Sequence, residues 1–220
     1  MIKGPGYLEG AVISIVAEDT IAFDTPFIGR FGFSALLELK AASCEKQILY
    51  DTNSAAAPIL HNLGILGKSL DKLSTIFLSH IVNGQTVQDH ERDDAAVILN
   101  FEQGLVIVTG CCHAGIVNTM AQAKRITWVD KIYAVIGGLH FIGASEEKIE
   151  KSIEALCEVD WVFAGHCTGF DGLRRIANAM GDRFGQIQTG TIIHLPVKGD
   201  SPPLSTIPTA VRDLNRSFGE

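Results

Sequence analysis

The sequence predicts a layered α/β fold with the architecture of an αββα sandwich. Strand-like runs gather in the first half of the 220-residue chain, and strands alternate with helices from about residue 105 onward. Four apolar, strand-like runs also stop at a histidine: His80, His113, His140 and His166. Because strand ends can meet in one crevice, we expect these four ends to mark a ligand site.

The first half of the chain contains short apolar or β-rich runs separated by polar and glycine-containing segments. These runs predict strands at residues 11–16, 34–40, 47–50, 76–79 and 96–99. Residues 55–66 instead have the apolar spacing of a helix. The chain shows no linker, repeat or low-complexity stretch before its last twenty residues.

The second half of the chain alternates strands and helices. Helices are predicted at 115–125, 146–156 and 172–180, with Ser145 and Asp171 as N-caps of the last two. Residues 199–220 contain three prolines and are predicted to run over the surface. We therefore expect one domain over residues 1–198, followed by a surface tail at 199–220.

Composition narrows the class of partner. The formal charge of −7 argues against a nucleic-acid binder, because phosphate contacts need clustered Lys and Arg side chains. The N-terminus has no apolar signal core and no run reaches membrane-spanning length, so we expect a cytoplasmic protein without a membrane partner. A small-molecule substrate, even an anionic one, fits, because a bound metal can outweigh the global charge locally. Self-association into a homo-oligomer stays open.

The histidines at the strand ends indicate a metal site. A single histidine after a strand is more often a hydrogen-bonded structural residue than a ligand. Here four of the seven histidines occupy equivalent positions, and neutral imidazole is the commonest metal ligand. Several imidazoles held on rigid elements are what a divalent ion needs for tight binding.

The five cysteines indicate neither a disulfide framework nor a zinc ribbon, because their number is odd and no C-x-x-C spacing occurs. Cys44 and Cys157 look like small core residues. Cys111, Cys112 and Cys167 each lie beside a strand-end histidine, where a thiolate could bind metal or act as a nucleophile. Packing beneath the site is the simpler role for these three cysteines.

Seven short segments, taken in order, resemble one known group of proteins. They are residues 32–38, 48–52, 77–80, 93–97, 109–116, 136–140 and 166–169. Together they resemble the metallo-β-lactamase fold superfamily, and within it the branch of dihydropterin ribofuranosyl-aminobenzene phosphate synthase-like proteins of methanopterin biosynthesis. The resemblance covers most of the chain, and the shared order is far more specific than any one segment.

The chain departs from this family pattern directly after His80. The family has a second histidine two residues on and then an Asp-His pair, whereas residues 81–85 read IVNGQ. The family also has several tens of residues before its Asp-Asp segment, where this chain has only residues 81–92. We therefore expect a gap or deletion after His80.

The resemblance implies one or two divalent metal ions, zinc ahead of manganese or iron. His113 and His166 match ligand positions of the family, and His80 is the remaining part of the hallmark motif. Three imidazoles and a water make a sound catalytic zinc site, provided that the three rings converge.

Further residues are assigned supporting roles. By resemblance, Asp51 accepts the second N–H of a ligating histidine, with a loop cap as the equal alternative. Cys112 packs beneath the site. His140 follows two glycines that allow close backbone approach, and it contacts a ligand or the substrate; Asp94 faces the metal or a solvated turn.

Residues Thr168 and Gly169 precede a predicted helix and form a candidate cradle for an anion. The reason is that the first turn of a helix offers unpaired N–H groups, which suit a phosphate.

Three functions compete. The first is a metal-dependent hydrolase in which a metal-bound hydroxide attacks an ester or phosphoester, with a phosphorylated pterin or ribosyl substrate implied by the branch and with His140 or Asp94 assisting with protons. The second is a degenerate, non-catalytic binding or assembly module, favoured by the residues missing after His80. The third is cysteine chemistry at Cys112 or Cys167, ranked last because sequence neighbours rarely face each other.

Overall fold

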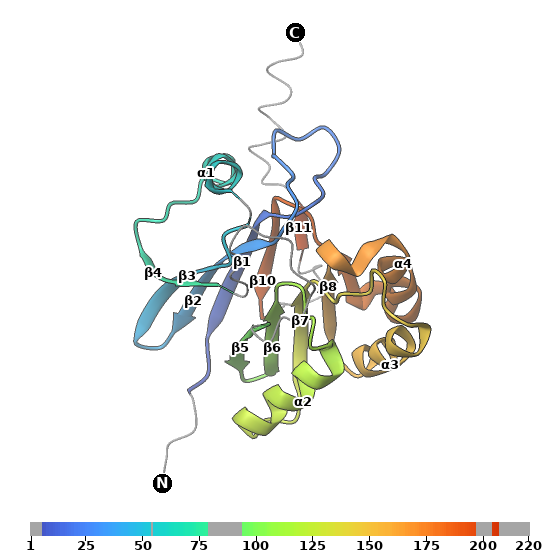
Figure 1. Cartoon of the computed structure of the whole chain (residues 1–220). Coiled ribbons are helices and arrows are strands. Elements are labelled where there is room, and N and C mark those ends of the chain that lie inside the picture. Colours follow the sequence, from blue (N-terminus) through green and yellow to red (C-terminus); the bar gives the residue numbers. More distant parts are fainter. Residues whose placement is uncertain (1–5, 54, 79–93, 197–203, 207–220) are drawn as a thin grey trace. The chain divides into compact units, whose positions relative to one another are not determined.

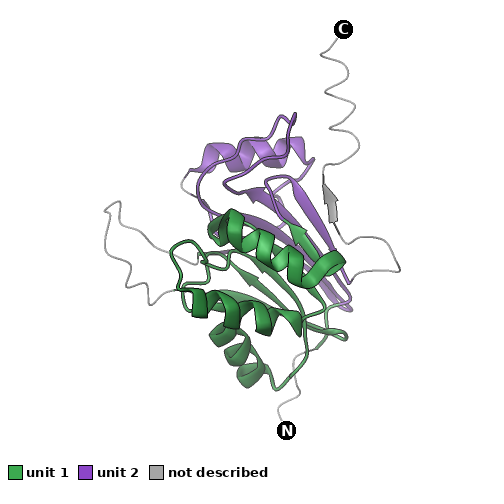
Figure 2. Cartoon of the chain, turned by 90° about the vertical axis from the view of Figure 1, so that its right-hand side faces the viewer, with its two compact units in different colours: residues 1–8, 78–186 green, residues 9–77, 187–220 purple. Residues whose placement is uncertain are grey.

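The computed structural model describes residues 6–53, 55–78, 94–196 and 204–206. The chain divides into two compact units: unit 1 consists of residues 1–8 and 78–186, and unit 2 of residues 9–77 and 187–220 (Figure 2). Among the described residues each unit contains one mixed β-sheet, with helix α1 in unit 2 and helices α2, α3 and α4 in unit 1 (Figure 1). The prediction of one domain followed by a tail stays a prediction. His80 and the expected gap after it lie outside the described residues.

Unit 2 contains a six-stranded sheet in the order β11-β10-β1-β2-β3-β4. The strands are β1 (Gly10–Ala17), β2 (Ser34–Ala41), β3 (Cys44–Tyr50), β4 (Leu73–Phe77), β10 (Thr191–Leu195) and β11 (Leu204–Thr206). Neighbouring strands are antiparallel except β3 and β4, which are parallel because helix α1 (Ala56–Ile65) connects them.

Helix α1 holds the core of unit 2 through one apolar face and one buried amide. Ile59 and Leu63 are buried in a cluster that includes Val16 of β1. The fully buried Asn62 amide donates to the carbonyls of Val16 and Ile28 and accepts from the Ile28 N–H, each at 2.9 Å. Because the NH₂ group and the carbonyl oxygen of the amide all have hydrogen-bond partners, this polar side chain is tolerated in an apolar core.

Unit 1 contains a five-stranded sheet in the order β5-β6-β7-β8-β9. The strands are β5 (Ala96–Phe101), β6 (Gly104–Thr109), β7 (Ile132–Gly137), β8 (Trp161–Ala164) and β9 (Phe184–Gln186). Only β5 and β6 pair antiparallel, and β6 to β9 are parallel. Every residue of β6 and β7 is buried, which is typical of the continuous apolar runs of parallel strands.

Three helices connect the parallel strands of unit 1: α2 (Ile116–Thr127), α3 (Glu146–Cys157) and α4 (Gly169–Met180). Short 3-10 turns stand before and after α4, at His166–Thr168 and Gly181–Arg183. The apolar faces of the three helices contribute Met120, Ile149 and Ile176 to the core cluster of the unit.

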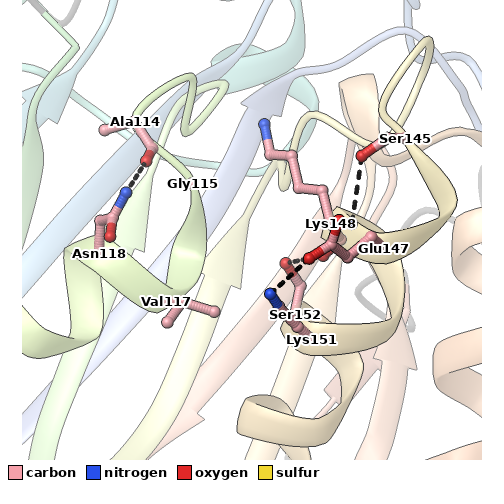
Figure 3. A pocket seen from close by; sticks show the side chains of 9 residues that line it. All are labelled: Ala114, Gly115, Val117, Asn118, Ser145, Glu147, Lys148, Lys151 and Ser152. Carbon is pink, nitrogen blue, oxygen red and sulfur yellow. Dashed lines mark hydrogen bonds and ion pairs between the residues drawn. The ribbon is translucent and has the colours of Figure 1, made fainter.

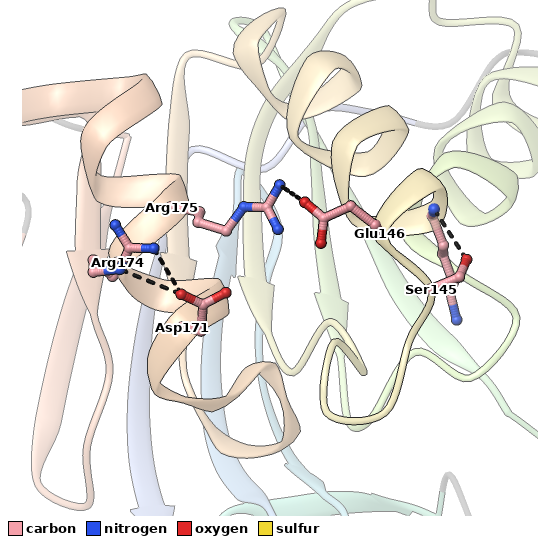
Figure 4. A network of polar contacts seen from close by, with 6 residues as sticks. Ser145, Glu146, Asp171, Arg174 and Arg175 are labelled. Carbon is pink, nitrogen blue, oxygen red and sulfur yellow. Dashed lines mark hydrogen bonds and ion pairs between the residues drawn. The ribbon is translucent and has the colours of Figure 1, made fainter.

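Helices α3 and α4 are joined by an ion pair between Glu146 and Arg175, with 2.6 Å between the carboxylate and guanidinium atoms (Figure 4). The hydrogen bond to Glu146 raises the pKa of Arg175 above its usual value, so this partner stays charged. The Glu146 side chain is exposed and that of Arg175 is partly buried, so the pair fixes orientation more than it stabilises.

Most of the elements predicted from the sequence are present in the structure, with ends that differ by a few residues. The strands predicted at 11–16, 34–40, 47–50 and 96–99 are confirmed as β1, β2, β3 and β5, and the four predicted helices are confirmed as α1 to α4. The cap prediction for Ser145 is confirmed, because its hydroxyl accepts from the Lys148 N–H. The cap prediction for Asp171 is wrong: Thr168 occupies the N-cap position of α4, and Asp171 lies in the first turn paired with Arg174 (Figure 4).

Candidate metal centre

Three strand ends of unit 1 carry histidines to the same edge of the sheet. Strands β6, β7 and β8 are parallel neighbours, so their carboxyl ends meet at one edge. The loops that follow these strands contain His113, His140 and His166, respectively. The fold thus gathers three of the four histidines that end strand-like runs in the sequence.

The backbone of these loops is held in an uncommon conformation. Cys112, His140 and His166 have positive φ angles of 63°, 49° and 50°. A left-handed conformation is unfavourable for residues other than glycine, so the surrounding contacts must hold it. Such residues concentrate at functional sites, and here one occurs in each of the three loops.

Gly138 lets the three loops pack tightly. A Cβ atom added there would lie 2.5 Å from the carbonyl oxygen of Gly110, 2.8 Å from Sγ of Cys167 and 3.2 Å from Cδ2 of His166. The Gly138 N–H donates to the Gly110 carbonyl at 2.9 Å, and its own carbonyl accepts from the Thr109 hydroxyl at 2.9 Å. The close backbone approach expected at this glycine pair is therefore confirmed.

Two thiols and one imidazole form a group of ligand-type atoms at this edge. One ligand atom each from Cys111, His166 and Cys167 lie within 4.8 Å of one another. Sγ of Cys111 is 3.1 Å from Nε2 of His166, and the Cys167 thiol donates to the Cys111 carbonyl at 3.2 Å. Both cysteines are partly buried and His166 is buried, so little water competes for these atoms.

This environment favours the thiolate form of Cys167. Its pKa is lowered to about 6, first because the Cys111 side chain hydrogen-bonds to it, and then through the charge of His166 and hydrogen bonds from His140. Burial acts in the opposite direction and is outweighed.

His113 and His140 form a second pair. Their ring centroids are 4.3 Å apart, and the ring planes stand at 72° to each other. Nδ1 of His140 is buried and has no hydrogen-bond partner among the described residues. No group of three metal-ligand side chains within the described part of the chain includes His113, so the structure does not bring His113 and His166 into one three-residue ligand set.

Asp94 ties the start of the sheet to the loop after β6. Its Oδ2 accepts from the Ala114 N–H at 2.9 Å, directly after His113 in the chain. Its Oδ1 is buried and finds no hydrogen-bond partner among the described residues. The carboxylate therefore lies next to the histidine loop, and its two expected roles stay predictions.

Cys112 differs from the two cysteines of the thiol–imidazole group. Its side chain is 1% exposed, and Sγ lies 3.5 Å from the hydroxyl of Thr119 on α2. Burial raises the pKa of this thiol to about 12, with a smaller opposing effect of Thr119. A thiol that stays protonated and buried is a poor nucleophile, which argues against cysteine chemistry at Cys112.

Both residues of the predicted anion cradle also make contacts within the protein, and the cradle itself stays a prediction. Thr168 is buried, and its hydroxyl accepts from the Leu139 N–H at 3.1 Å. Gly169 has a φ angle of 70°, and a Cβ there would lie 2.7 Å from Ile142. Through these contacts, Thr168 and Gly169 hold the loop after β8 against the loop after β7.

Asp51 lies in unit 2, at the end of β3. Its Oδ1 accepts from the Thr52 N–H at 3.0 Å, and its backbone carbonyl accepts from the Ser34 hydroxyl at 2.7 Å. These bonds fit the loop cap that was one of its two expected roles. The predicted bond to a ligating histidine stays a prediction.

A cavity of about 370 Å³ lies between the beginnings of α2 and α3 (Figure 3). Its lining begins at Ala114, directly after His113, and includes Asn118 and Lys148. Lys148 makes no ion pair with any described residue, whereas Lys151 is paired with Glu147 at 2.6 Å. Sequence patterns did not predict this cavity, because it arises from the packing of two helices distant in the chain.

The donor set of the thiol–imidazole group suits a divalent metal. Thiolate sulfur and imidazole nitrogen are the preferred ligands of zinc in proteins, and three protein ligands leave a fourth position open. The sequence signal for Cys111 and Cys167 was their position beside strand-end histidines, yet which cysteine meets which histidine follows from the fold.

Comparison with known proteins identifies the fold. The chain is similar to 7,8-dihydropterin-6-methyl-4-(beta-D-ribofuranosyl)-aminobenzene-5'-phosphate synthase of Methanocaldococcus jannaschii, with 24% identity over 292 aligned positions that cover 88% of this chain and 99% of the synthase. Since this chain has 220 residues, the synthase has residues without a counterpart here. An uncharacterized protein of the same organism is 29% identical over 108 residues, covering 49% of this chain and 40% of that protein.

A solved structure is also similar to this chain. The crystal structure of a metal-dependent hydrolase of the β-lactamase superfamily matches with a TM-score of 0.66 and 18% identity, covering 86% of this chain and 100% of the other. This likeness confirms the layered α/β fold that the sequence predicted. No family model matches the chain. Among the described residues, no helix has both the length and the apolar character needed to cross a membrane.

Proposed function

We propose that this chain, which has the metallo-β-lactamase fold, is a metal-dependent enzyme that acts on an ester or phosphoester bond of a small phosphorylated molecule. The observation that carries the proposal is the convergence of ligand-type side chains from β6, β7 and β8 at one sheet edge, with Cys111, His166 and Cys167 within 4.8 Å of one another. In open α/β sheets, this edge is where ligands bind.

The residues at the edge divide into ion-holding and proton-handling groups. His166 would hold the ion, and a divalent ion bound there would polarise the bond to be cleaved and lower the pKa of a water molecule. His140 would hold or release a proton at Nδ1, which finds no partner among the described residues. Asp94 would keep the His113 loop in place through its bond to Ala114.

The proposed substrate class follows from the relative and from the cavity beside His113. The similar synthase is named for a product with a ribofuranosyl phosphate and a pterin group, so we propose a phosphorylated pterin or ribosyl substrate here. Lys148, which lines the cavity without an acidic partner among the described residues, supplies a positive charge for the phosphate. Zinc as the metal, a cytoplasmic location and self-association remain predictions.

The test combines metal content with phosphoester hydrolysis. Purified protein is assayed for bound divalent metal and for cleavage of bis(p-nitrophenyl) phosphate, with His166→Ala compared to His194→Ala, a change of an exposed histidine on β10. We expect His166→Ala to lose metal and activity together while His194→Ala keeps both. Wild-type metal content and hydrolysis in His166→Ala would contradict the proposal.

A non-catalytic binding module is the second candidate, because Val82, Gly84 and Gln85 stand at the spacing where the family pattern has its second histidine and its Asp-His pair. Such a module would bind metal and a phosphorylated ligand without turnover. Metal-loaded protein that binds ribose 5-phosphate but cleaves no phosphoester over a panel of substrates would favour it over the enzyme.

A further inference from the structure

We propose that Cys111 and Cys167 are metal ligands together with His166, so that this chain holds its ion in a site of two thiolates and one imidazole. The inference rests on the proposed metal-dependent function and names the donor set of that site. It differs from the set of histidines that the sequence predicted, in which Cys111 and Cys167 only pack beneath the ion.

The distances suit zinc. Zinc lies about 2.3 Å from a cysteine sulfur and about 2.0 to 2.1 Å from a histidine nitrogen, so two ligand atoms of one tetrahedral ion are separated by roughly 3.5 to 3.8 Å. The three ligand atoms here lie within 4.8 Å of one another, and Sγ of Cys111 is 3.1 Å from Nε2 of His166. Side-chain rotation that changes these separations by at most about 1.3 Å would bring the three atoms onto one ion.

The three ligands stand on backbone that is held from several sides. The Cys167 carbonyl accepts from the N–H groups of Phe141 and Ile142, at 3.1 and 3.2 Å. Gly138 packs against both His166 and Cys167. Ligands that are positioned before the ion arrives lose little entropy on binding, which favours tight binding at this place.

The chemistry of the donors fits the departure from the family pattern. With the ion bound, both sulfur ligands are thiolates and any proton that a thiol still holds is released to solvent, so the ion's two positive charges are balanced by the ligands themselves. At the spacing where the family has its Asp-His pair, this chain has Gly84 and Gln85, and the two thiolates supply negative charge without that pair. Three protein ligands leave a fourth position for water or substrate, as in catalytic zinc sites.

Thiolate ligands also select the metal. Soft sulfur donors favour zinc over manganese or magnesium, which prefer oxygen. Cys112 takes no part, because its sulfur lies against Thr119 and does not belong to the group of three. The donor set is therefore specific to two of the three cysteines that lie beside strand-end histidines.

The first experiment uses cobalt as a spectroscopic substitute for zinc. Reduced, metal-free full-length protein is titrated with Co²⁺ while near-ultraviolet sulfur-to-cobalt charge-transfer absorption is recorded, for the wild type and for the variants Cys111→Ser, Cys167→Ser and His166→Ala. Cys157→Ser, a change of an exposed cysteine on α3, is the matched control.

We expect one cobalt per wild-type chain with strong charge-transfer absorption. Each of the two serine variants should lose about half of this absorption and bind at least about tenfold more weakly, while Cys157→Ser should match the wild type. Tight cobalt binding without charge-transfer absorption would overturn this inference and leave the proposed metal enzyme standing. Absence of any metal binding would overturn both.

A second measurement needs no substitution, so it remains decisive if a variant fails to fold. X-ray absorption of the zinc-loaded wild type counts the sulfur neighbours of the ion directly. Two sulfur atoms at about 2.3 Å support the inference, and fewer than two overturn it.

Discussion

Sγ of Cys111 and Nε2 of His166 are 3.1 Å apart, although 55 positions separate the two residues in the chain. They follow β6 and β8, which are not neighbours, because β7 lies between them. Strands two positions apart in a sheet are separated by roughly 9.5 Å. The two side chains meet across β7 because the loop after it passes Gly138, which has no side chain to fill the gap.

This arrangement predicts that Gly138→Ala disturbs both stability and metal binding. The added methyl group would press on the Gly110 carbonyl and on Cys167, so we expect a loss of about 1 to 3 kcal/mol in urea unfolding and at least about tenfold weaker Co²⁺ binding. Gly64→Ala is the control: nothing lies within 4 Å of its added Cβ in α1, and it should stabilise by about 0.5 to 1 kcal/mol. Equal behaviour of the two variants would refute the packing role of Gly138.

Thiol reactivity should separate Cys167 from Cys112. In metal-free protein the pKa of Cys167 is lowered to about 6 and that of Cys112 is raised to about 12. Alkylation of Cys167 by iodoacetamide should therefore speed up as the pH rises through 6 and level off above 7, while Cys112 stays unmodified in the folded protein. Peptide mass spectrometry after timed alkylation checks this.

The lowered pKa of Cys167 also makes the stability of the protein depend on pH. Its pKa is about 6 in the folded protein and near 9.0 when unfolded, so between these values the unfolded chain binds one more proton. The free energy of unfolding should therefore rise as the pH increases from about 6 to about 9. The stabilisation that comes from the lowered pKa of Cys167 should disappear as the pH falls through 6. Urea unfolding of metal-free wild type and Cys167→Ser at pH 5, 7 and 8.5 tests the slope, and identical slopes would contradict it.

Removing the ion should lower the stability of the folded state. An ion that binds only the folded protein adds about 2.7 kcal/mol when its free concentration is a hundred times the dissociation constant. Addition of a chelator to zinc-loaded protein should therefore lower the melting temperature, and added zinc should restore it. Thermal unfolding of His166→Ala is the comparison, and it should not respond to the chelator.

Helix capping predicts different effects for two residues that look alike in sequence. Ser145→Ala removes the bond to the Lys148 N–H and should cost about 1 kcal/mol of unfolding free energy. Asp171→Ala removes only an exposed pair with Arg174 and should cost about 0 to 0.5 kcal/mol. Denaturant unfolding of both variants measures these losses of unfolding free energy. An equal loss in the two variants would indicate that Asp171 also acts as a helix cap.

Much of the local structure could be read from sequence patterns, because periodicity and capping are local signals. The helix at 146–156 was predicted to within one residue, since its apolar spacing and its serine cap both lie inside one stretch of chain. The short strand β9 was missed: it has three residues, one of them glycine, and it forms by pairing with β8. The strand β10 has a β-rich sequence, Thr191–Leu195, that patterns alone could have revealed.

The sequence by itself determined the fold class and the order of the motifs that resemble the metallo-β-lactamase fold, because both depend on residues close together in the chain. Only the tertiary structure decided which side chains meet at the sheet edge. That choice depends on which parallel strands are neighbours and on where a glycine leaves space between them. For this reason His166 is grouped with Cys111 and Cys167, while His113 pairs with His140, an assignment that spacing along the chain could not make.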